Sequence, residues 1–202
     1  MKVSKGFLGK LLGEHGRVRS EETMPFVLAV MGTDRGVGTT HFCMAALNFL
    51  LNVRGLNAVM AELNPHPAEE CMRNSGEEAA DFILPFERIQ MAENRYDVVI
   101  LDISSDYPQG RSEFLRGGMR LLLGSLSPWK SEKLENVIRN MAEDGINKSF
   151  ICLSLSYNRE AAGRIKRAYG IDTQPLMFIE NPLSLKPQQC VWLNEKLESI
   201  WK

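Results

Sequence analysis

The sequence has 202 residues, of which 44% are hydrophobic and 24% are charged, and its formal net charge is -1 at pH 7. This length suits one domain, or one domain with a short appendage, and it allows a sizeable buried core. The near-neutral charge excludes a general nucleic-acid coat, and no apolar run reaches the ~18–20 residues that a membrane-spanning helix needs.

The four cysteines are far apart in the chain and form no Cys-x-x-Cys pair: Cys43, Cys71, Cys152 and Cys190. This spacing favours reduced thiols in a cytoplasmic protein over a disulfide framework or a zinc site. Cys43 and Cys152 lie within apolar runs, and we predict that both are small core residues.

The first segment of the chain, residues 1–23, is basic, and we separate it from an α/β domain at residues 24–202. Residues 1–19 hold five Lys and Arg against one Glu, which gives +4. Val3, Phe7 and Leu11 share one helical face, as in a helix that lies on an anionic membrane or docks into a partner. A tail without fixed structure, or a segment packed on its own domain, is the alternative, and both interpretations stay open.

The next elements are a strand at 26–31, a helix at 40–53 and a strand at 57–63. "FVLAVM" is short and apolar on both faces, and it ends at Gly32. The helix opens on threonines and has Gly55 just past its end. The prolines of 64–95 predict loops and short helices there.

Further along the chain, strands are predicted at 96–103, 119–126, 148–155 and 174–180. Helices are predicted from Ser127, with Pro128 at the first helical position, to Gly145, and at 158–170 and 187–202. Asp106 is assigned to a solvated loop. Alternating strands and helices, with strands apolar on both faces, predict an α/β fold: a doubly wound, mostly parallel sheet in three α/β/α layers.

Polar residues follow three of these strands: the loop "GTDRGVGTTH", Glu62 with Asn64, and Asp102. Ligands of parallel sheets bind at the carboxyl ends of the strands, so we expect these groups to meet at one edge. Gly36, Gly38 and the helix that follows have the form of a phosphate cradle, in which backbone N–H groups face the phosphate. The alternative is a tight turn whose Thr39 or Thr40 caps the helix.

Residues 34–40, "DRGVGTT", align with the deviant loop K-G-G-x-G-K-[ST] of the ParA/MinD group of P-loop ATPases. "VMAELNPH", "YDVVILDIS", "LSLSYN" and "PLMFIENP" follow in the same order as that family's later motifs. Together they resemble the ParA/MinD family and imply a P-loop NTPase-like fold. Its degenerate localisation-type members, such as the TadZ/CpaE proteins of pilus systems, are the most similar in kind.

The resemblance implies a nucleotide site for ATP or ADP with magnesium. Its phosphate loop would comprise Arg35, Gly36, Val37, Gly38, Thr39 and Thr40. Thr40 and Asp102 would hold the magnesium ion, and Asn158 would read the adenine. From the residues alone, Asp102 can equally bond to the loop or to Thr40.

Three charged positions of the family are changed together: the signature lysine is Asp34, the loop lysine is Thr39, and the carboxylate that prepares the attacking water is Asn64. Phosphoryl transfer depends on such charges, and Asp34 adds repulsion, so we expect weak nucleotide binding and slow or absent hydrolysis, with no catalytic residue.

The leading functional hypothesis is a cytoplasmic positioning, assembly or scaffold factor. It would work with a protein partner or a second copy of the chain, and residues 1–20 would contact a membrane peripherally. The alternative is an atypical ATPase in which Arg35 replaces the missing lysines. The sequence shows no strong nucleic-acid signal.

Overall fold

The computed structural model describes residues 24–63, 82–88, 95–103, 105–146 and 149–201. The predicted segment 1–23, Asn64 and Cys71 lie outside the described residues. Within the described part, no helix has both the length and the hydropathy needed to cross a membrane.

A seven-stranded sheet forms the centre of the described structure, in the order β3-β2-β4-β1-β5-β6-β7, and every strand pair is parallel. The strands are β1 Phe26–Gly32, β2 Ala58–Glu62, β3 Ile83–Pro85, β4 Val98–Ile103, β5 Met119–Gly124, β6 Ile151–Ser154 and β7 Thr173–Pro175. The predicted parallel sheet is therefore confirmed.

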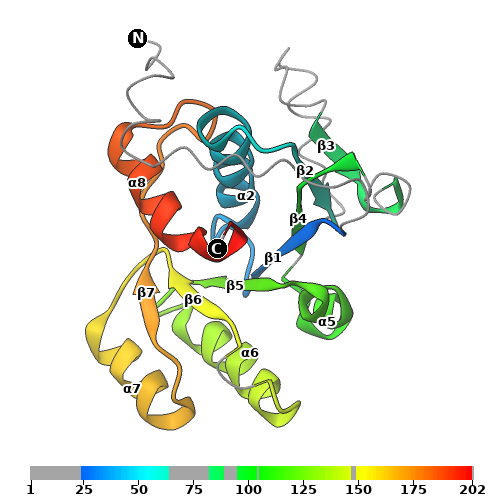
Figure 1. The fold of residues 1–202 in the computed structure, drawn as a ribbon. Helices are drawn as coiled ribbons and strands as arrows, with labels where there is room; N and C mark the ends of the chain where they lie inside the picture. Colours follow the sequence, from blue (N-terminus) through cyan, green and yellow to red (C-terminus); the bar gives the residue numbers. More distant parts are fainter. Residues whose placement is uncertain (1–23, 64–81, 89–94, 104, 147–148, 202) are drawn as a thin grey trace.

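Helices cover both faces of the sheet, which confirms the three-layer prediction (Figure 1). α2 Thr39–Asn48, its π-helical continuation Phe49–Arg54, and α8 Pro187–Lys196 lie on one face. α5 Tyr107–Arg116, α6 Ser131–Glu143 and α7 Arg159–Tyr169 lie on the other. Single 3-10 turns occur at Phe86–Arg88 and Glu198–Ile200.

The alternation of side chains along β1 explains why its sequence reads as one apolar run. Leu28 and Val30 belong to the core beneath α2 and α8, while Ala29 and Met31 belong to the core beneath α5 and α6. Successive side chains of a strand point to opposite faces, so a strand covered on both sides needs apolar residues throughout.

The predicted C-terminal helix is confirmed over Pro187–Lys196 but ends before the predicted 202, and a 3-10 turn at Glu198–Ile200 follows it. Leu193 and Leu197 are fully buried, and Trp201 lies against Phe49 with ring centroids 6.2 Å apart. The Arg54 guanidinium carbon lies 4.3 Å from the centroid of the Trp201 ring. These contacts close the end of the chain onto the π-helical turn, whose following residue, Gly55, has the left-handed φ of 68°.

Two boundary predictions were wrong. The helix placed at Ser127 begins at Ser131, because the Ser127 carbonyl closes a separate turn by accepting bonds from the N–H groups of Lys130 and Ser131 at 3.0 and 2.9 Å. The strand placed at 174–180 is only β7, after which the chain is irregular. Leu176 still donates to the Ser154 carbonyl at 2.8 Å.

Two elements were not predicted. α5 begins directly after Asp106, whose side chain accepts from the Gln109 N–H at 3.4 Å as the N-cap. Asp106 itself is exposed and lies outside the helix, as predicted. β3 is a three-residue strand that ends at Pro85, at the sheet edge where proline is tolerated.

Two glycines within helices give a matched test of the packing. A methyl group on Gly110 of α5 would overlap the Ile103 side chain and lie 3.0 Å from the Met31 methyl. We expect Gly110→Ala to lower the free energy of unfolding by about 1–3 kcal/mol. Gly163→Ala on α7 would meet only the mobile end of Arg167, at 3.4 Å, and should raise it by about 0.5–1 kcal/mol. Urea titrations of both variants measure the free energy of unfolding. Equal changes in the two variants would contradict the close packing of Gly110 against Ile103.

Candidate functional site

The carboxyl ends of β1, β2 and β4 bring the predicted polar groups to one edge of the sheet. Asp102 is in register with Glu62 of β2 and with Val30 of β1, two residues before the glycine loop begins. The predicted convergence of Glu62, Asp102 and the loop is confirmed, while Asn64 lies outside the described residues.

The loop between β1 and α2 depends on glycine at three positions. Gly36 and Gly38 have φ values of 72° and 90°, in the left-handed region that favours glycine. A Cβ on Gly32 would lie 2.5 Å from the Thr39 hydroxyl, so the chain can only turn this tightly without one. Val37, between the two left-handed glycines, is buried in the core and anchors the turn.

α2 begins without a capping side chain, because its N-cap is Gly38. The interpretation in which Thr39 or Thr40 caps this helix was therefore wrong. The first N–H groups of a helix have no partner within the helix, and together with the helix dipole they favour an anion. The turn thus keeps the backbone features of a phosphate cradle.

Thr40 and Asp102, the two predicted magnesium ligands, are in direct contact. The Thr40 hydroxyl donates to Asp102 Oδ2 at 2.6 Å, and Asp102 has no exposed surface. The sequence analysis left open whether Asp102 bonds to Thr40, and this bond is present. The hydroxyl and carboxylate oxygens of the two residues are ligands that magnesium prefers. The residues therefore fit such an ion, although their role as its ligands remains a prediction.

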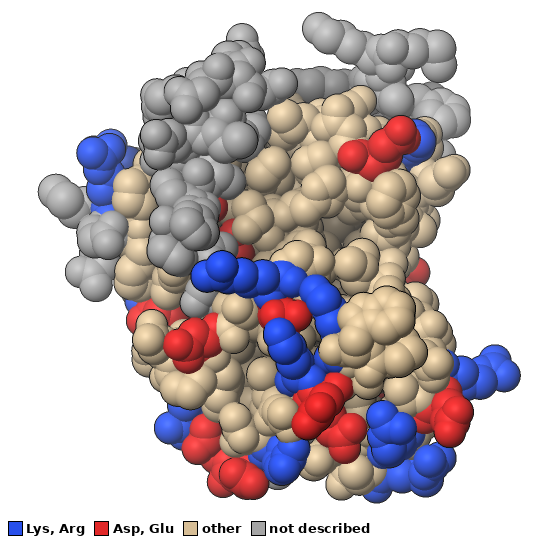
Figure 2. Space-filling model, turned by 180° about the vertical axis from the view of Figure 1, so that it is seen from behind, with Lys and Arg blue, Asp and Glu red and all other residues tan. Residues whose placement is uncertain are grey.

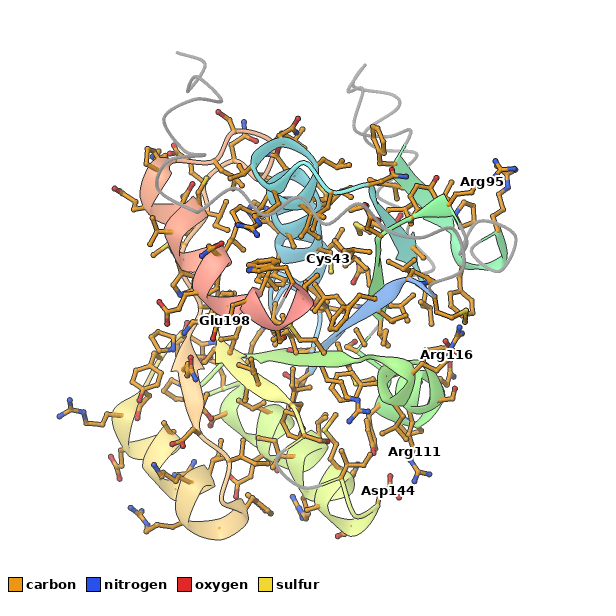
Figure 3. The ribbon with its side chains drawn as sticks, viewed as in Figure 1. Cys43, Arg95, Arg111, Arg116, Asp144 and Glu198 are labelled. Carbon is orange, nitrogen blue, oxygen red and sulfur yellow. The ribbon has the colours of Figure 1, made fainter. Side chains whose placement is uncertain are left out.

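A second acid, Glu62, is 6% exposed beside Asp102. Burial raises the pKa of the Cys43 thiol well above its ordinary value, and the charges of Asp102 and Glu62 raise it further. Cys43 lies on α2 (Figure 3). The thiol is held in its neutral form, so this arrangement does not support a nucleophilic cysteine.

Asp34 is bound by two lysines from the start of α6, which the sequence analysis did not anticipate. Lys133 Nζ lies 2.8 Å from Asp34 Oδ1, and Lys130 Nζ lies 3.3 Å from Asp34 Oδ2. The hydrogen bond from Lys133 is the main cause of the lowered pKa of Asp34. The expectation that Asp34 simply adds repulsion was incomplete, because its charge is compensated.

Lys130 also contacts the main chain of the loop. Its Nζ donates to the Arg35 carbonyl at 2.8 Å, and it lies 3.9 Å from the position of a Cβ on Gly36. The only available signal was positional: "SPWKSEKL" follows the predicted strand at 119–126, so its first residues lie at the same edge as the loop. Arg35 itself is exposed.

The segment 175–182, which the resemblance places beside the base, lies against α2. His41 Nε2 donates to the Ile179 carbonyl at 2.6 Å, and Asn48 Nδ2 donates to the Pro182 carbonyl at 2.9 Å. Asn158 is exposed after β6 and caps α7, where its Oδ1 accepts from the Ala161 N–H at 3.0 Å. Its predicted contact with adenine would have to leave this cap in place.

Lys and Arg side chains lie among Asp and Glu side chains on the face shown in Figure 2. The described part of this face carries no broad surface of one sign. The described part of this face therefore has no basic stripe of the kind that a nucleic-acid backbone would contact (Figure 2).

No family model matches the sequence, and no curated protein matches it. Several solved structures, however, are similar to this chain in fold. A putative plasmid partition protein from Borrelia burgdorferi B31, bound to AMPPNP, has a TM-score of 0.57 at 10% identity, over 89% of this chain and 98% of that chain. A ParA family ATPase from Chlorobium tepidum has a TM-score of 0.52 at 14% identity, over 89% and 93%.

A third structure is also similar: the cell division protein FtsY from Thermotoga maritima has a TM-score of 0.51 at 18% identity, over 94% of this chain and 74% of that chain. At these identities the likeness concerns the fold. The parallel sheet, the glycine loop after β1 and these neighbours agree: the chain has an α/β, P-loop NTPase-like fold, similar to that of the partition protein and the ParA family ATPase.

Proposed function

We propose that this chain is a ParA/MinD-like protein with a degenerate nucleotide site that acts as a positioning, assembly or scaffold factor, with weak or no ATP hydrolysis. One observation carries the proposal. The turn before α2 keeps the left-handed Gly36 and Gly38 of a phosphate cradle, whereas the positions of the two cations hold Asp34 and Thr39.

Nucleotide binding depends on the parts of the site that side-chain changes leave intact. The N–H groups at the start of α2 would bind phosphate oxygens, and Thr40 and Asp102 would hold a magnesium ion that neutralises phosphate charge. The fold neighbour from Borrelia burgdorferi was solved with AMPPNP, which supports ATP or ADP as the ligand class.

Hydrolysis needs more than this cradle. Loss of one charge-stabilising group typically costs a few kcal/mol of the barrier, or ~100-fold or more in rate. Thr39 supplies no cation, and Asn64 has no carboxylate with which to orient a water molecule. Binding and turnover are therefore separable in this chain.

Calorimetry with ATP and magnesium, followed by a phosphate-release assay on the same sample, tests the proposal. We expect saturable binding and phosphate release no faster than in a protein-free control. The scaffold function would be overturned if the protein released phosphate faster than the control and the Asp102→Ala variant did not. A complete lack of binding would overturn the nucleotide site.

The alternative function, an atypical ATPase, is favoured by Arg35, which is exposed and directly precedes Gly36 in the loop. Arginine can bind phosphate oxygens through two parallel hydrogen bonds. If the ATPase function holds, Arg35→Ala will abolish phosphate release, whereas Arg159→Ala, an exposed arginine on α7, will leave it unchanged.

Protein docking would use the apolar side chains on the loops after β5, β6 and β7. Trp129 and Phe178 are 79% and 77% exposed, and Leu155 and Tyr157 are also exposed between them in sequence. Four such side chains on the loops at one edge are typical of an interaction surface rather than of scattered surface residues. We propose a second copy of the chain as the occupant, since this edge also carries the nucleotide loop.

The docking surface predicts the oligomeric state. We expect the full chain with AMPPNP to show the mass of a dimer in light scattering. We expect the double variant Trp129→Ser/Phe178→Ser to have a dimer dissociation constant at least tenfold higher. Val191→Ser, which changes an apolar residue of α8 that is 45% exposed, is the control. A wild-type chain that stays monomeric with nucleotide, or a double variant that dimerises normally, would contradict this surface.

A further inference from the structure

We infer that Lys130 supplies the phosphate-binding cation that the loop itself has lost, delivered from the start of α6 rather than from the loop. Asp34 holds this lysine in place when no phosphate is bound. The ligand is the di- or triphosphate group of a nucleotide, so the inference rests on the proposed nucleotide site.

The position of the Lys130 amine carries the inference. Its Nζ lies 2.8 Å from the Arg35 carbonyl, 3.3 Å from Asp34 Oδ2 and 3.9 Å from the Cβ position of Gly36. These distances place a positive charge directly beside the turn that would surround the phosphate. The side chain is 29% exposed, so it keeps room to move toward a ligand.

The backbone that carries Lys130 is fixed at both ends of α6. At the start, the Lys130 N–H donates to the Ser127 carbonyl at 3.0 Å, just after β5, which pairs with β1. At the end, the Asp144 carboxylate accepts from the Tyr107 hydroxyl at 2.8 Å and pairs with Arg111 at 3.2 Å (Figure 3). The amine is therefore presented by a well-anchored helix.

The charge balance of the cluster agrees with this role. Asp34 alone would place -1 beside a phosphate, but Lys130 and Lys133 together contribute +2, so the three residues sum to +1. The lowered pKa of Asp34 keeps this carboxylate charged. An arriving phosphate can therefore replace one carboxylate oxygen as the partner of Lys130, while Lys133 remains bound to Asp34.

Lys133 is the matched control, because it binds the same acid but lies more than 4 Å from the Cβ position of Gly36. Its Nζ donates to Asp34 Oδ1 at 2.8 Å, and its side chain is 57% exposed. A general effect of positive charge would involve both lysines equally, whereas a specific phosphate contact involves Lys130.

The experiment is calorimetry of the full chain with AMPPNP and magnesium, and separately with inorganic triphosphate. We expect Lys130→Met to weaken both ligands at least tenfold, Lys133→Met to weaken them less than threefold, and Lys130→Arg to stay within threefold of the wild type. Thermal unfolding of each variant, measured alongside, confirms that it is folded.

The outcomes separate this inference from the proposed function. If the wild type binds AMPPNP and folded Lys130→Met binds it equally well, the inference fails and the nucleotide site stands. The inference also fails if Lys133→Met loses as much affinity as Lys130→Met. If the wild type binds neither ligand, both are wrong.

Discussion

Thr39→Lys should tighten the binding of ATP at least tenfold, because it restores the loop cation at the first position of α2. Tenfold corresponds to about 1.4 kcal/mol, which is less than the few kcal/mol that a phosphate-stabilising group typically contributes. The Thr39 hydroxyl already faces the start of the loop, at 2.5 Å from a Cβ position on Gly32. Calorimetry of the variant and the wild type measures the change.

Thr39→Met is the control for this substitution, because it has a side chain of similar length without the charge. We expect it to bind ATP no more tightly than the wild type does. Phosphate release should stay near background in Thr39→Lys, since Asn64 still lacks a carboxylate. If Thr39→Met gains as much affinity as Thr39→Lys, the missing charge does not explain the weak site.

Asp102→Ala should remove the dependence of nucleotide binding on magnesium. In the wild type we expect magnesium to raise the affinity for AMPPNP at least tenfold, because the ion would join the phosphates to Thr40 and Asp102. The variant also loses the 2.6 Å bond from Thr40, and hydrogen bonds to charged groups contribute about 1.5–3 kcal/mol, so the free energy of unfolding should fall by that amount.

Asp106→Asn provides the control for Asp102→Ala. Asp106 follows the same strand, but it is exposed and caps α5, and asparagine is an equally good N-cap. We expect neither the magnesium dependence nor the stability to change. Magnesium dependence that survives in folded Asp102→Ala would show that the ion is held elsewhere.

The sheet could be predicted because its physical signal is local. Strands buried on both faces must be apolar throughout, and "FVLAVM" and "YDVVILDI" have this pattern, so β1 and β4 were found close to their true bounds. β3 could not be found this way: it has three residues and ends in proline, so most of its definition comes from pairing with β2.

The helix at 107–116 was missed because its apolar residues are few. Tyr107 and Phe114 are buried, but the residues between them are mostly polar, so no apolar periodicity stands out. The available signal was the N-terminal one, an aspartate followed by a proline in the first turn. For α6, the same type of signal at Ser127 was misleading, because a separate turn precedes the helix.

The residues of the candidate site near the ends of strands were predicted from the sequence, but its long-range contacts were not. Thr40 lies at the start of α2, after β1, and Asp102 lies near the carboxyl end of the neighbouring strand β4, and the two are in contact. The pairing of Asp34 with Lys130 and Lys133 joins residues almost one hundred positions apart, and nothing in a single sequence specifies which lysine reaches which acid. The predicted roles of Arg35 and Asn158 toward a nucleotide remain predictions.

The most direct test of the central claim is a crystal structure of the full chain grown with AMPPNP and magnesium. The account predicts phosphate oxygens within hydrogen-bond distance of the N–H groups between Gly36 and Thr40. An ordered loop that stays empty at saturating nucleotide, or a nucleotide bound elsewhere, would contradict it.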